Sequence, residues 1–554
     1  MIIKGFWKRS YQARKLITLL FLNTYLVLIT GCNKQSELTS SSASENNSDR
    51  ITIGTISQPR TIDPADNYEL SGMMIIYNLS DTLYTYEVGT TKLKPQLATK
   101  MPTISKNGLV YTIRLRKGVK FHDGTAFNSE AMAFSLERFM ANGGKPSFLL
   151  TNTIEKIETN GKYELIITLK EPFSAFPALL AFPGICAVSP QAYKIGKGKF
   201  VPNNFVGTGP YKLKKFHTGL LQLDAFDNYW GEKPKNQGIN LQIYSNNAAN
   251  LFNAFRTKSI DIAYQSLTPE QVENLIKESR AGKGKVIENI STNITFMALN
   301  VNSEFTSQKV IRKAIATLID RELFNERIFK GQSELSYTMI PKSFNVSRPV
   351  FKDIYNNVAE AKQLLIEAGF SRKNPATIEI WYSSDSAEMS QAAAILKSLA
   401  KRDFGGLLKF IPNNISSVAF FKNLSLGSYQ SILSNWYPDF LDADNYIYPF
   451  LNCIKGTATQ NCIEGSSQVQ GSFYNNEKIN QLITQQRKTL NSTKREEIFV
   501  KIQKILAEDV PYIPLWQTKE YAFIQNDING TIFNLNQTFP FWKITRSKIE
   551  KVVK

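Results

Sequence analysis

The 554-residue chain has few of the residues on which catalytic and metal sites usually depend. It contains two histidines, His122 and His217, and four cysteines. A His-ligated metal centre or a Ser-His-Asp triad would have to use one of these histidines, and no HExxH, GxSxG or CxxC occurs. Among 47 acids, nothing singles out a pair for carboxylate-based hydrolysis. We therefore expect a protein that is not an enzyme and that needs no metal or cofactor.

Long runs of basic residues are also absent, although the formal net charge is +19. Lys and Arg are spread along the chain, with no run of five or more and no nucleic-acid-binding motif. A solvated basic surface, which could lie near anionic lipid headgroups, explains this dispersed charge better than binding to nucleic acid does. With 42% hydrophobic and 12% aromatic residues, the chain can fold into two or three domains with buried cores.

The N-terminus has the features of an export signal. Five basic residues and no acid precede residue 31, and the interrupted apolar stretch at 16–29 is a poor spanning helix. The string Leu28-Ile29-Thr30-Gly31-Cys32 resembles a bacterial lipobox, in which Cys32 is lipidated. We expect a signal peptide at 1–31 and a Ser/Asn-rich tether at 32–49, anchoring the protein on the periplasmic or cell-surface side. A simple secretory signal with an incidental cysteine is the alternative.

The three other cysteines have two predicted roles. Cys453 and Cys462 are nine residues apart, and an exported protein allows them to form a disulfide. A closed loop of that size stabilises by about 2–3 kcal/mol. Cys186 lies in an apolar run at 178–188, so we expect it to be a buried small hydrophobe.

The stretch 108–139 predicts a strand, a turn and a helix, which is typical of an α/β protein. Tyr111 and Ile113 alternate with polar neighbours, as on the buried face of a strand. His122 falls in an Asp-Gly turn, where a surface position is the default. Asn128 or Ser129 can then cap a helix.

Further helices are predicted from caps and apolar stripes. We expect helices at 70–84 and from Pro269, the latter with a Thr268–Gln271 capping box. One apolar stripe extends over 310–323, and a capping box at 493–496 heads a helix that ends by Pro511.

A string of aromatic and acidic residues follows an apolar pair at 432–433. It reads SNWYPDFLDADNY over 434–446. An acidic surface loop above packed aromatics would explain it. The functional interpretation is an aromatic-walled pocket in which a carboxylate meets a cationic group.

Eight strings occur in the order found in the extracellular solute-binding proteins of peptide and nickel ABC importers, and the chain resembles this family over about residues 50–520. The strings are QPRTIDPA at 58–65, KPQLA at 94–98, RLRKGVKFHDGTAFNSEA at 114–131, GTGPYKL at 207–213, DNYWGEKP at 227–234, VIRKAIATLIDRE at 310–322, AKQLLIEAGF at 361–370 and NWYPDF at 435–440.

The resemblance implies an α/β fold of the periplasmic-binding-protein-like type II, with two lobes joined by a hinge and an extra small inserted domain. Lobe I would combine 50–84, 206–292 and 516–554. The inserted domain would be 85–205, and lobe II would be 293–515.

The resemblance also implies a monomer that closes its hinge on a ligand and delivers it to an ABC permease with a separate ATPase. In peptide-binding relatives, the acid three residues after the tryptophan of NWYPDF holds the peptide α-ammonium, and Asp439 has that position. Backbone near Gln58 would pair with an extended ligand. The residues expected to bind ligand are Asn435, Trp436, Tyr437, Asp439, Gln58, Pro59 and Arg60.

Two departures from the family narrow the range of expected ligands. Dipeptide-specific relatives hold the ligand carboxylate with an arginine in a segment that here reads WYSSDSAEMSQ at 381–391, without arginine. Neither histidine falls in a segment expected to line the cleft, which disfavours nickel. Peptides of several residues fit best. A nickel complex, an oligosaccharide, a ligand-sensing role and a secreted hydrolase are the alternatives.

Overall fold

The computed structural model describes residues 49–264, 267–457 and 461–547. The predicted signal peptide, Cys32 and all of the tether except Asp49 lie outside these residues. Among the helices of the described ranges, none combines the length and the apolar character needed to cross a membrane.

A twelve-stranded sheet connects most of the described chain. Its order is β16-β15-β17-β13-β20-β11-β1-β10-β9-β8, and β12 and β14 also pair with β20. On one side of β20 are β8 (Tyr211–His217), β9 (Leu220–Ala225), β10 (Gly238–Ile243), β1 (Arg50–Thr55), β11 (Ile262–Tyr264) and β12 (Lys285–Ile290). On the other are β13 (Ile294–Leu299), β14 (Ser333–Leu335), β15 (Ala376–Ser383), β16 (Leu408–Ile415) and β17 (Ser431–Trp436). We call the first group and its helices lobe I, and the second lobe II.

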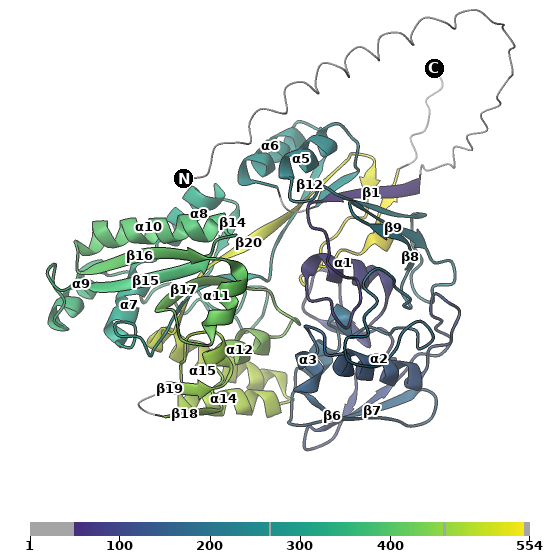
Figure 1. Cartoon of the computed structure of the whole chain (residues 1–554), viewed down its shortest axis with the longest axis horizontal. Coiled ribbons are helices and arrows are strands. Elements are labelled where there is room, and N and C mark those ends of the chain that lie inside the picture. The colour runs from purple at the N-terminus through teal and green to yellow at the C-terminus, as the bar shows by residue number, and fades with distance from the viewer. Residues whose placement is uncertain (1–48, 265–266, 458–460, 548–554) are drawn as a thin grey trace, which may run out of the picture. The chain divides into compact units, whose positions relative to one another are not determined.

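The long strand β20 (Tyr512–Ile524) crosses from one lobe to the other. Its residues 512–516 pair with β13, whereas residues 519–524 pair with β12. The segment 291–293 makes the return crossing beside it, and Gln517 Nε2 donates to the carbonyl of Ser291 at 2.7 Å. Figure 1 shows β20 in yellow running between the two groups of strands. Two adjacent crossings therefore join the lobes, as the predicted hinge requires.

A small sheet contains the strand predicted at the start of the stretch 108–139. Its order is β4 (Thr103–Ile104), β5 (Val110–Arg114), β7 (Glu164–Leu169) and β6 (Ile154–Thr159). Tyr111 and Ile113 are fully buried, as the alternation predicts. The next helix, α2 (Ser129–Ala141), is capped by Asn128, whose Oδ1 accepts from the amide of Ala131 at 2.9 Å. The strand and the helix are confirmed.

The expected surface position of His122 is wrong. The side chain is 9% exposed because the turn packs against 207–209. The amide of Gly207 donates to Nδ1 at 3.3 Å, and Nε2 lies 3.1 Å from the carbonyl oxygen of Gly209. Burial lowers the pKa of His122 to about 4, so the ring is neutral near pH 7.

Three helix predictions need correction. Helix α1 (Leu70–Leu79) stops before 84 because Ser80 is extended, and β2 (Tyr84–Tyr86) follows. The stripe at 310–323 divides into α7 (Lys309–Leu318) and α8 (Arg321–Phe329), because Asp320 caps α8 by accepting from Leu323 N at 2.9 Å. Helix α15 (Ser492–Asp509) is capped by Asn491, so the predicted box at 493–496 lies inside the helix.

The capping box before Pro269 is confirmed, with Thr268 and Gln271 bonded reciprocally. The other helices are α3 (Phe148–Thr151), α4 (Phe176–Leu179), α5 (Ala248–Arg256), α6 (Pro269–Arg280), α9 (Val358–Glu367), α10 (Ala387–Phe404), α11 (Ser417–Leu424), α12 (Tyr448–Leu451), α13 (Ser466–Val469) and α14 (Glu477–Lys488). The short strands are β3 (Leu93–Pro95), β18 (Lys455–Thr457), β19 (Asn461–Glu464), β21 (Ile528–Asn529) and β22 (Thr545–Arg546).

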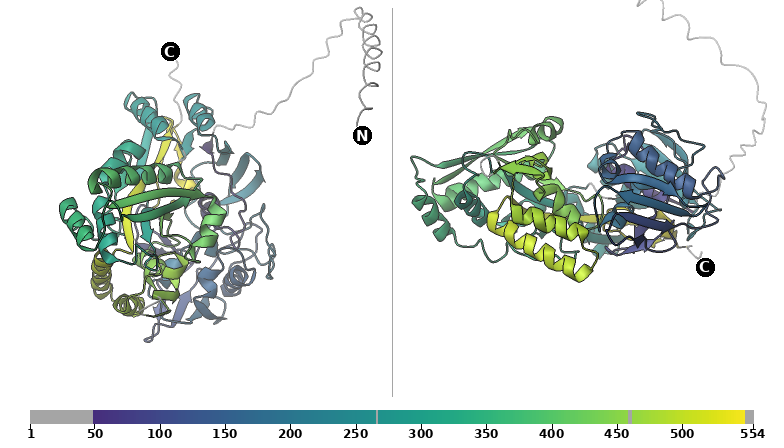
Figure 2. Two further views of the ribbon diagram at one scale, coloured as in Figure 1. Left: turned by 60° about the vertical axis from the view of Figure 1, so that its left-hand side comes forward. Right: turned by 90° about the horizontal axis from the view of Figure 1, so that it is seen from below.

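The hydrophobic cores divide the chain somewhat differently from the predicted domains. The small sheet shares one core with lobe II, and Phe173 meets Phe440 edge-on at 5.9 Å between ring centroids. Cys186, buried as predicted, and Tyr193 instead pack in the core of lobe I. In the view from below in Figure 2, the blue elements, which include the small sheet, lie on one side and the green elements of lobe II on the other. The domain boundaries given by the resemblance stay a prediction.

Candidate ligand-binding site

Asp439 lies in the loop after β17, where it faces lobe I. β17 is a buried strand, and Pro438, which has no amide hydrogen to donate, follows it closely. The loop is fixed where the amide of Asp439 donates to Asn445 Oδ1 at 3.0 Å. Across the lobes, the hydroxyl of Tyr68 donates to Asp439 Oδ1 at 2.6 Å. The half-buried carboxylate therefore lies where the two lobes meet.

The carboxylate of Asp439 has hydrogen-bond donors but no cationic partner among the described residues. Burial raises its pKa to about 6, and the bonds from Tyr68 and Asn445 oppose this rise. Burial and the adjacent carboxylate raise the pKa of Tyr68 far above its usual value, so its hydroxyl stays a donor. None of the ion pairs found in the described ranges includes Asp439. A desolvated carboxylate without a counter-ion favours a cationic group on a ligand.

The neighbours of Asp439 differ in their surroundings. Trp436 Nε1 donates to Asn445 Oδ1 at 3.2 Å, and its ring packs against Phe450, so Trp436 supports the loop from below. Tyr437 is 40% exposed and lines an interlobe pocket. Asn435 is exposed at the end of β17, where it pairs with Thr295 of β13. The segment 435–439 thus combines a residue that packs against the core, Trp436, with the solvent-exposed residues Asn435 and Tyr437.

The predicted residues of lobe I form a braced segment that leads to Tyr68. Gln58 is exposed, and its Oε1 accepts from the amide of Gly219 at 3.2 Å. Pro59 is buried. Arg60 pairs with Asp66 at 2.7 Å and with Glu69 at 3.2 Å. With these two acids as partners, its guanidinium holds the loop that carries Tyr68. No feature of the sequence identified Tyr68 itself.

A pocket of about 270 Å³ lies between the lobes beside this loop. It is lined by Leu70, Leu267, Val272, Tyr437, Thr518, Lys519, Glu520, Tyr521, Phe523 and Gln537. Tyr437 comes from lobe II, whereas the others come from β20 and from lobe I. Glu520 is 7% exposed, and its Oε2 has no hydrogen-bond partner among the described residues. No feature of the sequence pointed to Glu520.

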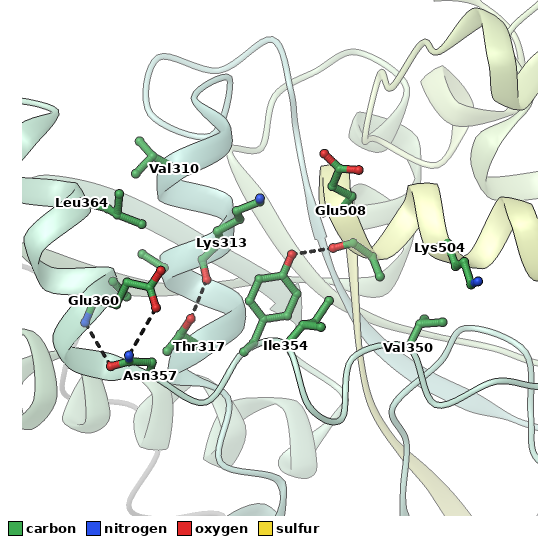
Figure 3. Close-up of a pocket in the computed structure, with 14 residues that line it drawn as sticks. Val310, Lys313, Thr317, Val350, Ile354, Asn357, Glu360, Leu364, Lys504 and Glu508 are labelled. Carbon is green, nitrogen blue, oxygen red and sulfur yellow. Dashed lines mark hydrogen bonds between the residues drawn. The ribbon is translucent and has the colours of Figure 1, made fainter.

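A second groove, of about 480 Å³, lies within lobe II alone. It is formed by α7, α9 and α15, and Figure 3 shows Val310, Lys313, Leu364, Lys504 and Glu508 around it. Tyr355 and Ala507 also line this groove, and the hydroxyl of Tyr355 donates to the carbonyl of Ala507 at 2.5 Å. None of the ligand-binding residues expected from the sequence lines this groove.

Several of the recognisable strings build the scaffold. Gln96, Thr208, Tyr229 and Trp230 come from three of them, and all four side chains donate to the carboxylate of Asp81 at 2.6–2.9 Å. The string QPRTIDPA contributes Asp63, which forms a buried bidentate ion pair with Arg138 of α2 at 2.6 and 2.8 Å. These polar residues fix lobe I against the helix of the small sheet.

Cys453 and Cys462 are joined in the structure, with their Cα atoms 5.6 Å apart, a separation typical of disulfides. They lie in and beside the hairpin formed by β18 and β19. In the described part of the chain, no group of three or more His, Cys, Asp and Glu side chains could hold a metal ion.

Known proteins similar to this chain agree with its architecture. The probable D,D-dipeptide-binding periplasmic protein DdpA of Escherichia coli is 25% identical over 503 residues, covering 89% of this chain and 93% of DdpA. Heme-binding protein A of Haemophilus influenzae is 24% identical, covering 91% and 93%. The periplasmic binding protein DppA of Helicobacter pylori, solved in complex with the peptide STSA, has a TM-score of 0.72 at 22% identity, covering 90% and 98%. The predicted two-lobed type II fold is confirmed.

The family model for the bacterial extracellular solute-binding proteins, family 5 (middle), matches residues 92–458. This match covers more than half of the chain and includes Asp439. The chain therefore belongs to the bacterial extracellular solute-binding proteins of family 5, the solute-binding components of ABC importers.

Proposed function

We propose that this protein captures oligopeptides in the cleft between its lobes and delivers them to an ABC permease. In this proposal Asp439 binds the α-ammonium of the peptide. The observation that carries it is the half-buried carboxylate of Asp439, which faces lobe I and has no cationic partner in the described ranges. An ammonium group would supply the missing charge and form charge-assisted hydrogen bonds.

The crossing strands support a closing mechanism. Lobe II carries Asp439 and Tyr437, lobe I carries Tyr68, and the two crossings at 291–293 and 517–518 connect them. Rotation about these crossings would close the lobes on a peptide and exclude water from Asp439. Excluding water strengthens the pairing of ammonium and carboxylate because the local dielectric falls.

Two observations support peptides as ligands. A family member of similar fold was solved with a bound peptide, and a relative is named for dipeptide binding. The segment 381–391 has no arginine to hold a nearby ligand carboxylate, which favours peptides longer than two residues.

A thermal-shift screen of the purified protein tests the proposal. A library of free peptides of two to eight residues is compared with the same peptides N-acetylated. A peptide at about 100 times its dissociation constant adds about 2.7 kcal/mol to stability, so free peptides should raise the melting temperature clearly. The absence of any shift, or equal shifts for acetylated peptides, would contradict the proposal.

We also propose that lipidated Cys32 anchors the mature protein to a membrane. Cys32 lies outside the described residues, so the proposal depends on the lipobox and on the Ser/Asn-rich segment after it. Cells expressing the Cys32→Ser variant should lose the protein from the detergent phase of a phase-separation assay, whereas a Cys186→Ser control should not. Retention of the Cys32→Ser variant in the detergent phase would exclude this anchor.

A further inference from the structure

Glu520 occupies an unusual position on the strand that joins the lobes. It lies on β20 just after the crossing, where it is in register with Asn289 of β12. Its side chain lines the interlobe pocket that also contains Tyr437 of lobe II. The carboxyl group is therefore placed where both lobes contribute to one cavity.

The carboxyl group of Glu520 is buried without the partners that it needs. It is 7% exposed, the side chain of Ser291 interacts with it, and Oε2 has no hydrogen-bond partner among the described residues. Two titratable groups that interact with it are Tyr264 of β11 and Tyr437, both neutral near pH 7. Burial raises the pKa of Glu520 to about 8. A buried, incompletely bonded carboxyl group lowers the stability of the fold.

The nearest basic residue in the sequence does not neutralise Glu520. Lys519 lines the same pocket, but successive side chains of a strand point to opposite faces. None of the ion pairs found in the described ranges includes Glu520. Among the described residues no cation pairs with this acid, so a cationic group that enters the pocket with a ligand would meet an unpaired carboxyl group.

We propose that the pocket at Glu520 is a subsite for a basic side chain of the bound peptide. The ammonium of a lysyl side chain or the guanidinium of an arginyl side chain pairs with Glu520 beside Tyr437. Leu70 and the ring of Tyr437 line the same pocket of about 270 Å³ and cover the methylene stem. This inference rests on the proposed function, since it needs a peptide bound between the lobes.

The subsite gives the protein a preference among peptides. A neutral side chain of the same length fills the apolar lining but leaves Glu520 unpaired, whereas a basic one satisfies both. Asp439 and Glu520 then recognise two separate cations of one ligand, the α-ammonium and a side chain. Tyr437 lies two residues before Asp439 and lines the Glu520 pocket, which connects the two positions.

Calorimetry with matched tetrapeptides tests this inference. Each peptide has alanine at all positions except one of the first three, which carries lysine or its uncharged isostere norleucine. We expect one position at which the lysine peptide binds at least tenfold more tightly than the norleucine peptide. Equal affinities of the two peptides at all three positions would overturn the inference, and this comparison needs no variant of the protein.

Two variants then test whether the preference for lysine over norleucine depends on Glu520. Glu520→Gln should reduce the lysine-to-norleucine ratio to less than threefold and leave the affinity for tetra-alanine within twofold. Glu388→Gln, which removes an exposed acid that also interacts with Tyr437, should leave the ratio unchanged. An unchanged ratio in Glu520→Gln, or equal reductions in both variants, would overturn the inference. If tetra-alanine binds and lysine is not preferred, the subsite is overturned and the proposed peptide-binding function stands. If no peptide binds, both the subsite and the proposed function are overturned.

Discussion

The hydroxyl of Tyr68 and the carboxylate of Asp439 are 2.6 Å apart although 371 positions separate them in the chain. Tyr68 precedes α1 in lobe I, and Asp439 follows β17 in lobe II. The bond thus connects the two lobes through the carboxylate that we assign to the ligand. A bound α-ammonium would have to share Asp439 with this hydroxyl or displace it.

This relationship predicts a shifted pH dependence in Tyr68→Phe. The hydrogen bond from Tyr68 lowers the pKa of Asp439 towards about 6, so its loss should raise that pKa. Because the ammonium needs the ionised carboxylate, peptide affinity of the wild type should fall as pH drops below about 6. In the variant this fall should begin about one pH unit higher, since a bond to a charged group contributes about 1.5–3 kcal/mol.

Calorimetric titrations between pH 5 and 8 measure this shift. Tyr244→Phe is a suitable control, because it also removes a tyrosine hydroxyl. Burial raises the pKa of Tyr244, and no carboxylate is among the causes. Superimposable pH profiles for Tyr68→Phe and the wild type would show that the hydroxyl does not act on Asp439.

The buried carboxyl group of Glu520 predicts a stability that decreases with rising pH. Its pKa is about 8 in the folded chain and 4.5 ordinarily, so the folded protein keeps a proton that the unfolded chain loses. The stability from this group is complete below about pH 4.5, falls by about 1.4 kcal/mol per pH unit and is lost as pH passes 8. Glu520→Gln should therefore melt at a higher temperature than the wild type at pH 8.5.

Melting curves at pH 5 and pH 8.5 check this difference. At pH 5 the two proteins should melt within a degree or two of each other, because Glu520 is protonated in both the folded and, in part, the unfolded state. A variant that is less stable than the wild type at pH 8.5 would mean that the ionised carboxylate has a stabilising partner.

The ion pair of Asp63 and Arg138 should be among the most sensitive positions of the scaffold. Both side chains are almost fully buried, and Asp63 also accepts from the amide of Val201 at 2.6 Å. Asp63→Ala leaves the guanidinium charge buried without its partner, which should cost about 3–5 kcal/mol. Urea denaturation measures the loss. The exposed pair of Lys156 and Glu158 gives the control, since Glu158→Gln should change stability by less than about 1 kcal/mol. Equal effects of the two substitutions would contradict the structural role of Asp63.

Local sequence signals predicted much of the secondary structure. The alternation at Tyr111 and Ile113, and the caps at Asn128 and Thr268, depend on neighbours within four residues, and the structure has them all. The errors arose where two local signals competed. Asp320 interrupts an otherwise continuous apolar stripe, and Asn491 provides a cap before Thr493 can act.

The site was less accessible to sequence reasoning because its contacts are distant in the chain. Asp439 was identified through the resemblance, and its role stays a prediction. Tyr68 and Glu520 carried no motif, since one is defined by a bond across the lobes and the other by the lack of a partner. The turn containing His122 looked exposed because the glycine segment at 207–209 that covers it is far away in sequence.

The role of Asp439 is tested by measuring how one peptide and its N-acetylated form bind to the wild type and to Asp439→Asn. For a peptide identified in the thermal-shift screen, the variant should bind about 2–5 kcal/mol more weakly, because the α-ammonium loses its charged partner. Acetylation should weaken binding to the wild type by a similar amount and should have little further effect on the variant. Equal affinity of Asp439→Asn and the wild type for the free peptide would show that Asp439 does not bind the α-ammonium.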